Sequence, residues 1–390
     1  MTVSVFNVVF AGAGGINFGS PEGPWNHSER LEKLLGERLK VLAIIDPMIC
    51  VAQKRINDKL STGNKDVLNA YAQTQCFATI EDAKESEIGT RNTIHLIVNG
   101  IPPHFRGTEL KGKDADVQLM DAFPNAKAIL TEKPVSASDP TVIDCDSVAE
   151  HYKNFKGATS VGYVLRYLNV VQTLKKIMKQ HQIVPMCINA RYIMAYEYTT
   201  KLHWWNKDIS CGPIVEQATH FVDLIRYLSG SPIDHFSVQA RTVEHDCPAG
   251  KLNKMGFDEN ALIPAEQRIP RITTASWRHQ HGTLSTLMHG VALHGPDYST
   301  EIDIVADGWL LRLSDLYQDN PKLAILKQGA REYEIICGHD DPFLTEIQAI
   351  VSAVDSKDAG EKILSSYEDA LATYKMTWEI RKAGEAEQGK

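Results

Sequence analysis

The sequence predicts an α/β protein in two parts, a parallel sheet with crossover helices followed by a largely antiparallel sheet. In the first third of the chain, short β-branched runs alternate with stretches of helical spacing, which is the pattern of a parallel sheet. From about residue 160 the apolar residues alternate, which favours antiparallel strands with one face open or used for assembly. The length of 390 residues allows two domains with hydrophobic cores of their own.

The elements of the first part follow from apolar runs and helical stripes. Each strand is a continuous apolar run, as expected for a strand buried on both faces. Helices are expected over 28–39, where three leucines share one stripe, and over 48–60. The strands are expected at residues 3–11, 39–45, 94–98 and 128–131.

The second part is predicted from alternating strands and a helical C-terminus. One helix is expected over 217–228 and two more at the end of the chain, the last behind a capping box at 366–369. We place a first domain at 1–157 and a second at 158–390, with C-terminal helices able to pack back on the first. The strands are expected at 188–198, 236–243, 272–278, 283–291 and 301–313, with turn residues such as Asp307-Gly308 between strands.

Composition and charge exclude several classes of protein. Hydrophobic residues make up 43% and charged residues 23%, and no stretch approaches the ~20 apolar residues of a membrane-spanning helix. The formal charge of −8 disfavours nucleic-acid binding, which needs a positive surface. No targeting segment is recognised at the start, and the seven cysteines are scattered without CxxC spacing, which predicts buried free thiols in a reducing compartment. We expect a cytoplasmic location.

A glycine-rich loop follows the first predicted strand. Residues 12–17 are Gly-Ala-Gly-Gly-Ile-Asn, so Asn17 replaces the third glycine of the GxGxxG pattern. Glycines permit a tight turn and let a pyrophosphate approach the backbone at the start of a helix. A purely structural turn is the alternative, because a glycine loop alone is weak evidence. The candidate cofactor contacts are Gly12, Gly14, Gly15, Ile16 and Asn17.

An acidic residue, Asp46, follows the second strand. A carboxylate there can accept hydrogen bonds from the adenosine ribose hydroxyls and repels a 2′-phosphate, which favours NAD without excluding NADP. The distance from the glycines exceeds the usual spacing of about 20 residues, and an inserted loop at 20–28 explains the excess. A helix cap or turn role is the alternative. Lys54 and Arg55 lie slightly downstream and weaken the preference for NAD.

Two further loops follow buried strands. They contain Pro-Pro-His at 102–104 and Glu-Lys-Pro at 132–134. In a parallel sheet, residues just past the carboxyl ends of strands line the ligand crevice. Lys133 is therefore well placed to bind a substrate hydroxyl or carbonyl, and the proline after it fixes the backbone. Taken alone, such a triplet is an ordinary solvated loop.

Glu216 and His220 stand four residues apart in a predicted helical region. One helix face then carries both side chains, with Asp223 and Tyr227 continuing it. A carboxylate beside an imidazole can orient the ring and raise its pKa, which suits a general acid or base. A salt bridge on a surface helix is the alternative.

Aromatic residues gather early in the second part. Aromatic faces can stack on a sugar ring, although aromatic side chains in strands more often belong to the core. We expect no metal site, because His279 and His281 share a strand face but no carboxylate or cysteine stands at convincing ligand spacing. The aromatic residues are Tyr192, Tyr196, Tyr198, Trp204 and Trp205.

Together these motifs resemble the glucose–fructose oxidoreductase / inositol dehydrogenase / rhizopine-catabolism (Gfo/Idh/MocA) family. The resemblance covers nearly the whole chain in the family's order. It implies an N-terminal Rossmann domain, a C-terminal α+β domain with an open, mostly antiparallel sheet, and nicotinamide-dependent redox chemistry on sugars, cyclic polyols or related compounds. It rests on the loop at 12–17, Asp46, the Pro-Pro-His turn, the Glu-Lys-Pro triplet, and the segments 161–166, 212–223 and 365–371.

The resemblance also implies roles for individual residues. Lys133 is the active-site lysine, His220 is the acid or base at the carbon that exchanges hydride, and Glu216 assists them. The family more often has Asp at the position of Glu216 and glycine at that of Cys211. The further candidate cofactor contacts are Pro102, His104, Glu132 and Lys133, beside the glycine loop and Asp46. The candidate substrate contacts are Tyr163, Arg166 and Trp204, and support of the domain junction is equally open for Arg166.

The expected reaction is the oxidation of a secondary alcohol with a nicotinamide cofactor. His220 takes the hydroxyl proton as hydride passes to C4 of the nicotinamide, and Lys133 donates a hydrogen bond to the same oxygen. A catalytically silent metabolite sensor, partnered with transcription factors, is the alternative, and the presence of both Lys133 and His220 favours the enzyme. We expect a homodimer or homotetramer that takes a small sugar-like or polyol-like substrate, with no nucleic-acid or membrane partner.

Overall fold

The computed structural model describes residues 4–21, 23–356 and 363–388 of the chain. It divides into two units, one of residues 1–164 with 341–371 and the other of residues 165–340 with 372–390. The domain boundary expected after residue 157 falls just before β6 (Ala158–Val161), the sixth strand of the first sheet. In the structure, the first unit includes this strand and continues to Val164 before the chain enters the second unit.

The sheet of the first unit is parallel throughout, with strand order β3-β2-β1-β4-β5-β6. The order reverses at β1, so that a ligand crevice is expected beyond the carboxyl ends of β1 and β4. The prediction is confirmed to the residue for β2 and β5. The strands are β1 (Phe6–Ala11), β2 (Leu39–Ile45), β3 (Gln75–Phe77), β4 (Leu96–Asn99), β5 (Ala128–Thr131) and β6.

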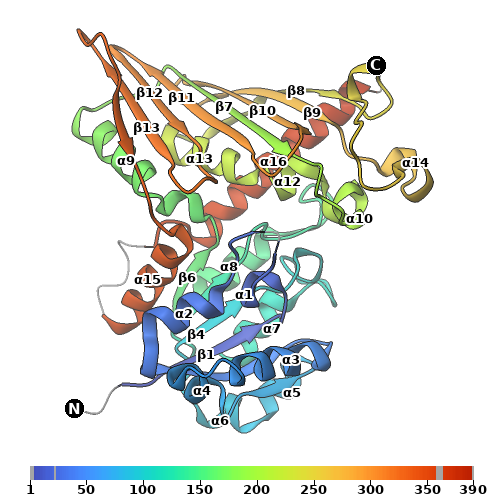
Figure 1. Ribbon diagram of the computed structural model, residues 1–390, viewed down its shortest axis with the longest axis vertical. Helices are drawn as coiled ribbons and strands as arrows, with labels where there is room; N and C mark the ends of the chain where they lie inside the picture. Colours follow the sequence, from blue (N-terminus) through green and yellow to red (C-terminus); the bar gives the residue numbers. More distant parts are fainter. Residues whose placement is uncertain (1–3, 22, 357–362, 389–390) are drawn as a thin grey trace. The chain divides into compact units, whose positions relative to one another are not determined.

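Helices of the first unit pack apolar side chains onto this sheet. Leu31 of α2, Ile56 of α3 and Ile347 of α15 join Phe6 and Phe10 of β1 in one buried cluster, and α15 lies against α2 (Figure 1). The helices are α1 (Gly15–Phe18), α2 (His27–Leu35), α3 (Ile49–Leu60), α4 (Lys65–Tyr71), α5 (Ile80–Glu85), α6 (Glu87–Arg91), α7 (Ala115–Ala122), α8 (Asp146–Asn154) and α15 (Pro342–Asp355).

The helix expected over 28–39 is shorter than predicted. The Oδ1 of Asn26 accepts a hydrogen bond from the backbone N–H of Glu29 at 3.1 Å, which fixes the start of α2. Gly36 has φ +52°, a conformation that suits glycine, and it ends the helix there. A separate short turn over Gly36–Arg38 then leads into β2.

The second unit is built on a mixed sheet with strand order β14-β13-β12-β11-β7-β10-β9-β8. The pairing of β7 with β10 is parallel and the other pairings are antiparallel. The strand expected over 301–313 is a hairpin, because Asp307 and Gly308 turn the chain between β11 and β12. The strands are β7 (Cys187–Ala195), β8 (Ile233–Val243), β9 (Ile272–His279), β10 (Leu284–Leu293), β11 (Ser299–Ala306), β12 (Trp309–Ser314), β13 (Lys322–Lys327) and β14 (Glu334–Cys337).

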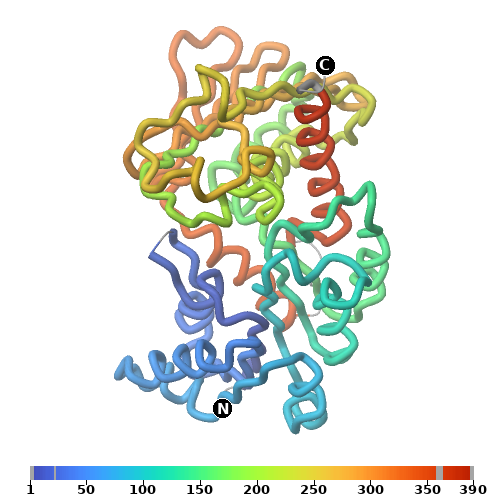
Figure 2. Tube along the Cα trace, turned by 90° about the vertical axis from the view of Figure 1, so that its right-hand side faces the viewer, coloured from blue at the N-terminus to red at the C-terminus, as the bar shows by residue number. Residues whose placement is uncertain are grey.

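Helices gather on one face of this sheet (Figure 1). Leu174 of α9, Phe221 of α13 and Ile380 of α16 are buried in the same cluster as strand residues such as Ile302. Figure 2 shows the end of α16 beside the strand β8, where Gly384 approaches Thr242. The helices are α9 (Asn169–Gln180), α10 (Leu202–Trp205), α11 (Lys207–Ser210), α12 (Gly212–Glu216), α13 (Thr219–Ser229), α14 (Glu259–Leu262) and α16 (Tyr367–Gln388), which the unit division crosses after Leu371.

The opposite face of the sheet is polar and open. Asn189, Arg191, Thr274, Ser276 and Thr286 are exposed along it. They line a hollow of about 780 Å³ on the surface. The sequence pattern predicted one open face, and alternation along β7, β9 and β10 produces it.

A buried ion pair ties α13 to the start of the second unit. Arg166 is 3% exposed and Asp223 is 1% exposed. The Arg166 guanidinium donates to both carboxylate oxygens of Asp223, at 2.7 and 2.6 Å, and lies over the ring of Tyr227 at 4.7 Å. Thr373 donates a further hydrogen bond to Asp223. A charge pair so completely enclosed is stable only while both partners are present.

Replacing Asp223 by Asn should therefore destabilise the protein, because it leaves the Arg166 cation buried without its counterion. We expect a loss of about 3–5 kcal/mol in the free energy of unfolding, measured by urea denaturation. The matched control is Asp234→Asn, whose partner Arg278 is 58% exposed and whose loss should change the midpoint little. Equal midpoints for the two variants would contradict the prediction.

Candidate active site

Two glycines of the loop after β1, Gly12 and Gly14, differ in what the structure demands of them. Gly12 has φ +92°, and a Cβ there would lie 3.0 Å from the carbonyl oxygen of Gly100. Gly14 has φ −72° and ψ 179°, an extended conformation open to any residue, and a Cβ there would meet nothing within 4 Å. Neither the fold of the loop nor a neighbouring group requires glycine at 14. The open space over its backbone is the shape that an approaching pyrophosphate needs, so the loop fits a dinucleotide.

Asn17, at the third position of the glycine pattern, holds this loop from behind. Its side chain is 0% exposed, and its Nδ2 donates to the carbonyl oxygens of Ala11 at 3.2 Å and Gly12 at 2.7 Å. It also lies against Gly100, where a Cβ would come within 2.7 Å of Nδ2. Sequence reasoning placed Asn17 among the cofactor contacts. The structure makes its side chain a support of the loop, because that side chain faces the interior.

The Asp46 carboxylate joins the glycine loop to the end of β2. Its Oδ2 accepts from the backbone N–H of Ala13 at 2.8 Å and its Oδ1 from that of Met48 at 2.9 Å. A carboxylate has about four acceptor positions, so ribose hydroxyls can still bind it. Arg55 of α3 donates from Nε to the carbonyl oxygen of Ala13 at 3.1 Å, which brings a cation to the same loop.

A buried hydrogen-bond network fixes the carboxyl ends of β4 and β5. The Asp116 carboxylate accepts from Asn99 at 2.7 Å, from Tyr152 at 2.9 Å and from the backbone N–H of Gly107 at 2.8 Å. The Tyr152 hydroxyl also lies 2.6 Å from that of Thr131. Burial raises the pKa of Asp116, and these donors together with the nearby Arg106 cation oppose the rise. The two strand ends that precede the Pro-Pro-His and Glu-Lys-Pro loops are thus held in one network.

Lys133 lies in a segment whose backbone is held by hydrogen bonds on both sides of the lysine. The Arg106 guanidinium is 1% exposed and donates to the carbonyl oxygens of Ile101, Glu132 and Val135. The Lys133–Pro134 peptide bond is cis. Lys133 and His104 are half-buried and Pro102 is exposed, while Glu132 is buried. The residues expected to meet a cofactor therefore end neighbouring strands of one sheet.

The Glu132 carboxylate lies in an interior cluster with a histidine and a second glutamate. His27, at the start of α2, is 0% exposed, and its Nε2 lies 2.6 Å from Glu132 Oε1. Glu346 of α15 is also 0% exposed and accepts a hydrogen bond from Ser160 at 3.3 Å. Burial, followed by repulsion from Glu132, raises the pKa of Glu346 well above its ordinary value. Both causes favour the neutral form of the Glu346 carboxyl. His27 reaches Glu132 from the start of α2, directly after the Asn26 cap.

The raised pKa of Glu346 predicts a pH-dependent stability. Above the pKa of an unfolded glutamate, about 4.3, the unfolded chain releases a proton that the folded protein retains. The wild-type protein should thus lose stability relative to Glu346→Gln as pH rises from about 5 to 8, by at most about 1.4 kcal/mol per pH unit. Urea denaturation at four pH values measures this difference. Glu85→Gln, at an exposed position of α5, serves as the control, and parallel curves for wild type and Glu346→Gln would refute the assignment.

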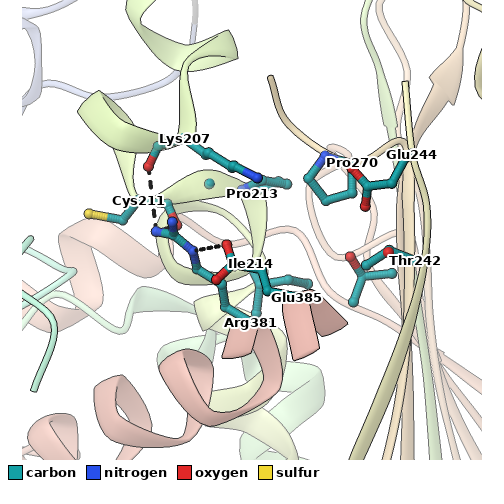
Figure 3. A pocket seen from close by; sticks show the side chains of 11 residues that line it. Lys207, Cys211, Pro213, Ile214, Thr242, Glu244, Pro270, Arg381 and Glu385 are labelled. Atoms are coloured by element: carbon teal, nitrogen blue, oxygen red, sulfur yellow. Dashed lines mark hydrogen bonds and ion pairs between the residues drawn. The ribbon is translucent and has the colours of Figure 1, made fainter. Parts of the chain in front are cut away.

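In the second unit, a pinned turn precedes the Glu216 segment. Cys211 has φ +64°, a left-handed conformation that explains why glycine suits this position. Arg381 of α16 donates to the carbonyl oxygens of Cys211 at 3.0 Å and Lys207 at 3.4 Å, and to Glu385 at 2.9 Å (Figure 3). The cavity beside it holds about 20 Å³, too little for a substrate. It is therefore a support point rather than a binding site.

Glu216 and His220 do not share one helix as predicted. Glu216 ends α12 and His220 lies in the first turn of α13, because the chain breaks helical geometry at Gln217, which has φ −108° and ψ −54°. Both side chains are half-buried. Trp204 Nε1 donates to Glu216 Oε2 at 3.0 Å, so the structure brings together two of the predicted site residues. Asp223 does follow His220 at three residues' distance on α13, and its carboxylate is enclosed with Arg166.

A neutral histidine holds the break between the two helices. His289 of β10 is 1% exposed, and burial lowers its pKa to about 3, so the ring carries one proton at neutral pH. Its Nε2 lies 2.8 Å from Gln217 Oε1, an acceptor, and therefore donates to it. This contact fixes Gln217 between Glu216 and His220. Sequence reasoning missed His289 and Gln217, because they are 72 residues apart and a single glutamine carries no chemical signature.

A cluster of three tyrosine rings lies beside His220. The rings of Tyr192, Tyr298 and Tyr317 lie 5.4–6.3 Å from one another between centroids, and the ring of His220 is 6.3 Å from that of Tyr317. Phe221 packs against Tyr192 at 5.1 Å. Sequence reasoning singled out Tyr192 and missed the other two tyrosines, which follow turns well downstream. Their closeness to Tyr192 arises from the folding of the second sheet, which brings together positions far apart in the sequence.

The remaining predicted substrate residues have other surroundings. Arg166 is enclosed with Asp223, which favours its supporting role over substrate contact. Tyr163 is 1% exposed, so contact with a substrate stays a prediction. Tyr196 and Trp205 are buried and Tyr198 is 70% exposed, which places the first two in the core.

Within residues 4–21, 23–356 and 363–388, no group of three or more His, Cys, Asp or Glu side chains is arranged to hold a metal ion. None of the helices in these ranges combines the length and apolar character needed to cross a membrane.

Comparison with known proteins identifies the family. A family model described as "Putative oxidoreductase C terminal domain" matches residues 166–309. Two uncharacterized proteins of Schizosaccharomyces pombe are each 37% identical to the chain, over 377 and 382 residues. These alignments cover 96% and 97% of this chain and 95% and 91% of the relatives. The chain belongs to the Gfo/Idh/MocA oxidoreductase family.

Solved structures of other proteins share the fold over nearly the whole chain. A super-repressor mutant of Gal80p from Saccharomyces cerevisiae is similar with TM-score 0.71 and 14% identity, covering 98% of this chain and 97% of that chain. A levoglucosan dehydrogenase in complex with NADH and L-sorbose has TM-score 0.70 and 13% identity, covering 98% of both. A 3-ketoreductase from Actinomadura kijaniata in complex with NADP and TDP-benzene has TM-score 0.67 and 12% identity, covering 98% of both.

At these identities the likeness extends to the fold alone. It includes proteins described as dehydrogenases and reductases and also Gal80p, described as a transcriptional regulator. The family is thus an oxidoreductase family whose fold also occurs in a regulator.

Proposed function

We propose that the protein is an NAD(P)-dependent oxidoreductase that transfers hydride between a nicotinamide and a secondary alcohol or ketone of a sugar, cyclic polyol or related diol. The observation that carries the proposal is the open space over Gly14, with the Asp46 carboxylate on the same loop. No group of this chain requires glycine at that position, whereas a dinucleotide does. Dehydrogenases and reductases with this fold, in complex with NADH or NADP, support the cofactor class.

The proposed chemistry divides among three side chains. When bound, the nicotinamide supplies the hydride acceptor. His220 accepts the proton of the substrate hydroxyl, and Lys133 donates a hydrogen bond to the same oxygen and stabilises its developing negative charge. Glu216, held by Trp204, orients His220 through its negative charge. In the reducing direction His220 returns the proton to the carbonyl oxygen.

The proposed cofactor is NAD, with NADP not excluded. Asp46 retains acceptor positions for the ribose hydroxyls and its charge repels a 2′-phosphate. Arg55 weakens this preference, because its guanidinium lies against Ala13 on the same loop. We further propose a cytoplasmic homodimer or homotetramer that associates through the open polar face of the second sheet, without a nucleic-acid partner.

Replacement of Gly14 by Val tests the cofactor site. The backbone at 14 accepts any residue, and the valine fills the space needed by a pyrophosphate, so NADH binding should fall at least about 100-fold. Quenching of tryptophan fluorescence by NADH measures the binding. The urea midpoint should stay that of the wild type, which separates lost binding from lost folding. Unchanged affinity in a folded variant would refute a dinucleotide at this loop.

Lys133→Ala and His220→Ala test the chemistry. Each should lower kcat by about 10²–10⁴-fold while NADH still binds, because proton transfer and charge stabilisation act in the chemical step. The assay is absorbance of reduced nicotinamide across sugars, inositols, sugar lactones and aromatic trans-diols. Lys111→Ala and His339→Asn, at exposed positions, are the matched controls. Undiminished turnover in Lys133→Ala would overturn the mechanism.

A catalytically silent NAD(P)-binding sensor is the second candidate, favoured by the likeness of the fold to Gal80p. It shares the cofactor site and lacks turnover. NADH binding together with silence across the whole substrate panel would favour it.

A further inference from the structure

The His27 ring is enclosed between α2 and α15 of the first unit. It is 0% exposed, and its centroid lies 6.1 Å from that of the Phe343 ring. Arg30, on the same helix as His27, lies over the Phe343 ring at 4.7 Å. Its Nε donates to both carboxylate oxygens of Asp341, at 2.9 and 2.8 Å. The helix that carries His27 is therefore fixed to the start of α15.

A hydrogen bond from this ring holds the side chain of Glu132. Nε2 of His27 lies 2.6 Å from Oε1 of Glu132, and a carboxylate is an acceptor, so the imidazole N–H donates. The other carboxylate oxygen lies against the backbone of Gly162, where a Cβ would come within 2.8 Å of Oε2. The backbone of Glu132 is held as well, since its N–H donates to the carbonyl oxygen of Asn99 at 3.0 Å and its carbonyl oxygen accepts from Arg106.

The burial of His27 is unfavourable for stability. Its Nδ1 has no hydrogen-bond partner in the part of the chain that the structure describes. A buried polar atom left in this way costs free energy of folding, whereas an apolar pair of similar size in place of the histidine and the glutamate avoids that cost. A stable core alone therefore does not require a histidine here. Buried polar groups with incomplete hydrogen bonding are typical of functional sites.

Glu346 makes the Glu132 carboxylate dependent on His27. Its carboxyl group lies in the same interior, accepts a hydrogen bond from Ser160 at 3.3 Å and is repelled by Glu132. Among the described residues, the hydrogen bond given to the Glu132 carboxylate is the one from His27. Loss of the imidazole would leave this carboxylate buried beside a second carboxyl group and without its donor.

The anchored residue directly precedes Lys133. Arg106 binds the carbonyl oxygens of Glu132 and Val135, one on each side of the lysine, and His27 anchors the Glu132 side chain. Release of that side chain would let residue 132 rotate and turn the peptide that leads to Lys133. Because a misplacement of about 1 Å at a reacting group can cost about 100-fold in rate, this anchor bears on the chemistry of the lysine.

We propose that His27 is a positioning residue for Lys133. Through its hydrogen bond to Glu132 it holds the segment that carries the lysine in the orientation in which the lysine donates to the substrate oxygen. The inference rests on the proposed function and adds to it a residue that none of the sequence motifs contains.

Steady-state kinetics of the full chain test this role, with NAD and the member of the sugar and polyol panel that turns over fastest. His27→Leu, without a donor, should lower kcat about 10-fold and leave KM within about twofold, because the group that stabilises the transition-state charge is displaced. His27→Gln carries an amide N–H near the position of Nε2 and should restore kcat to within about twofold of the wild type. His151→Leu, which removes the histidine of an exposed pair with Glu109 in the same unit, is the matched control.

A double variant shows whether His27 acts through Lys133. In the Lys133→Ala background, His27→Leu should lower kcat no further, because the group that it positions is already absent. A loss in the double variant equal to the product of the two single losses would overturn the inference.

Chemical labelling of Lys133 gives a readout that needs neither cofactor nor turnover. Acetic anhydride acylates deprotonated amines, and peptide mass spectrometry of the labelled full chain follows each lysine. In His27→Leu the Glu132 carboxylate loses its donor and attracts the neighbouring ammonium group, so Lys133 should be labelled at least about threefold more slowly. His27→Gln should label like the wild type. Lys111, exposed in the same unit, is the internal reference and should keep its rate.

The outcomes separate this inference from the proposed function. Wild-type kcat or wild-type labelling of Lys133 in folded His27→Leu would overturn the inference, and so would an equal loss in His27→Gln. If no member of the panel turns over, the proposed reaction fails, and the labelling of Lys133 then decides the inference by itself. Where urea denaturation shows that His27→Leu does not fold, His27→Asn replaces it with the same expected losses, since its short amide leaves room for a water beside Glu132.

Discussion

The Arg106 guanidinium is the contact on which the arrangement of the first unit most depends. It is 1% exposed, and its donors bind three backbone carbonyl oxygens, those of Ile101, Glu132 and Val135. A buried cation is tolerated only where its hydrogen bonds are satisfied and a negative charge lies near. Here the negative charge is that of Asp116, which is itself hydrogen-bonded to the ends of β4 and the loop after it. The hydrogen bonds of one guanidinium thereby fix two loops at the carboxyl edge of the sheet.

The second unit holds its candidate site residues with a buried group that carries no charge. His289 is buried without a counterion, and its pKa falls to about 3, so no charge is placed in the interior. Its single ring proton goes to Gln217, which lies between Glu216 and His220. The neutral His289 ring thus holds Gln217 by a hydrogen bond and adds no positive charge near Glu216 and His220. The charge next to His220 is then set by Glu216, whose position is fixed by Trp204.

Much of the fold was predictable because burial on both faces leaves continuous apolar runs in the sequence. The strands β2 and β5 match the prediction to the residue, whereas the end of α2 does not, because a left-handed Gly36 is indistinguishable in sequence from a glycine inside a helix. The residues proposed to react were chosen by their chemistry and their order along the chain. The residues that hold the site in place, such as Asp116, Arg106 and His289, could not be chosen in this way. Each of them makes its hydrogen bonds to residues that lie far away in the sequence. The single helix predicted through Glu216 and His220 is interrupted at Gln217, whose side chain accepts a hydrogen bond from His289 of a distant strand.

Asn17 and Gly100 are far apart in the sequence but in contact in the fold. A substitution at one of these positions therefore affects which residues the other can tolerate. A Cβ on residue 100 would lie 2.7 Å from Nδ2 of Asn17, which is too close for a non-bonded contact. Any side chain at 100 thus displaces Asn17 and releases its hydrogen bonds to the glycine loop. A glycine at 17 would remove the three atoms nearest to a Cβ on residue 100. The two residues are epistatic: the order in which a lineage substitutes them decides whether its intermediate keeps an ordered loop.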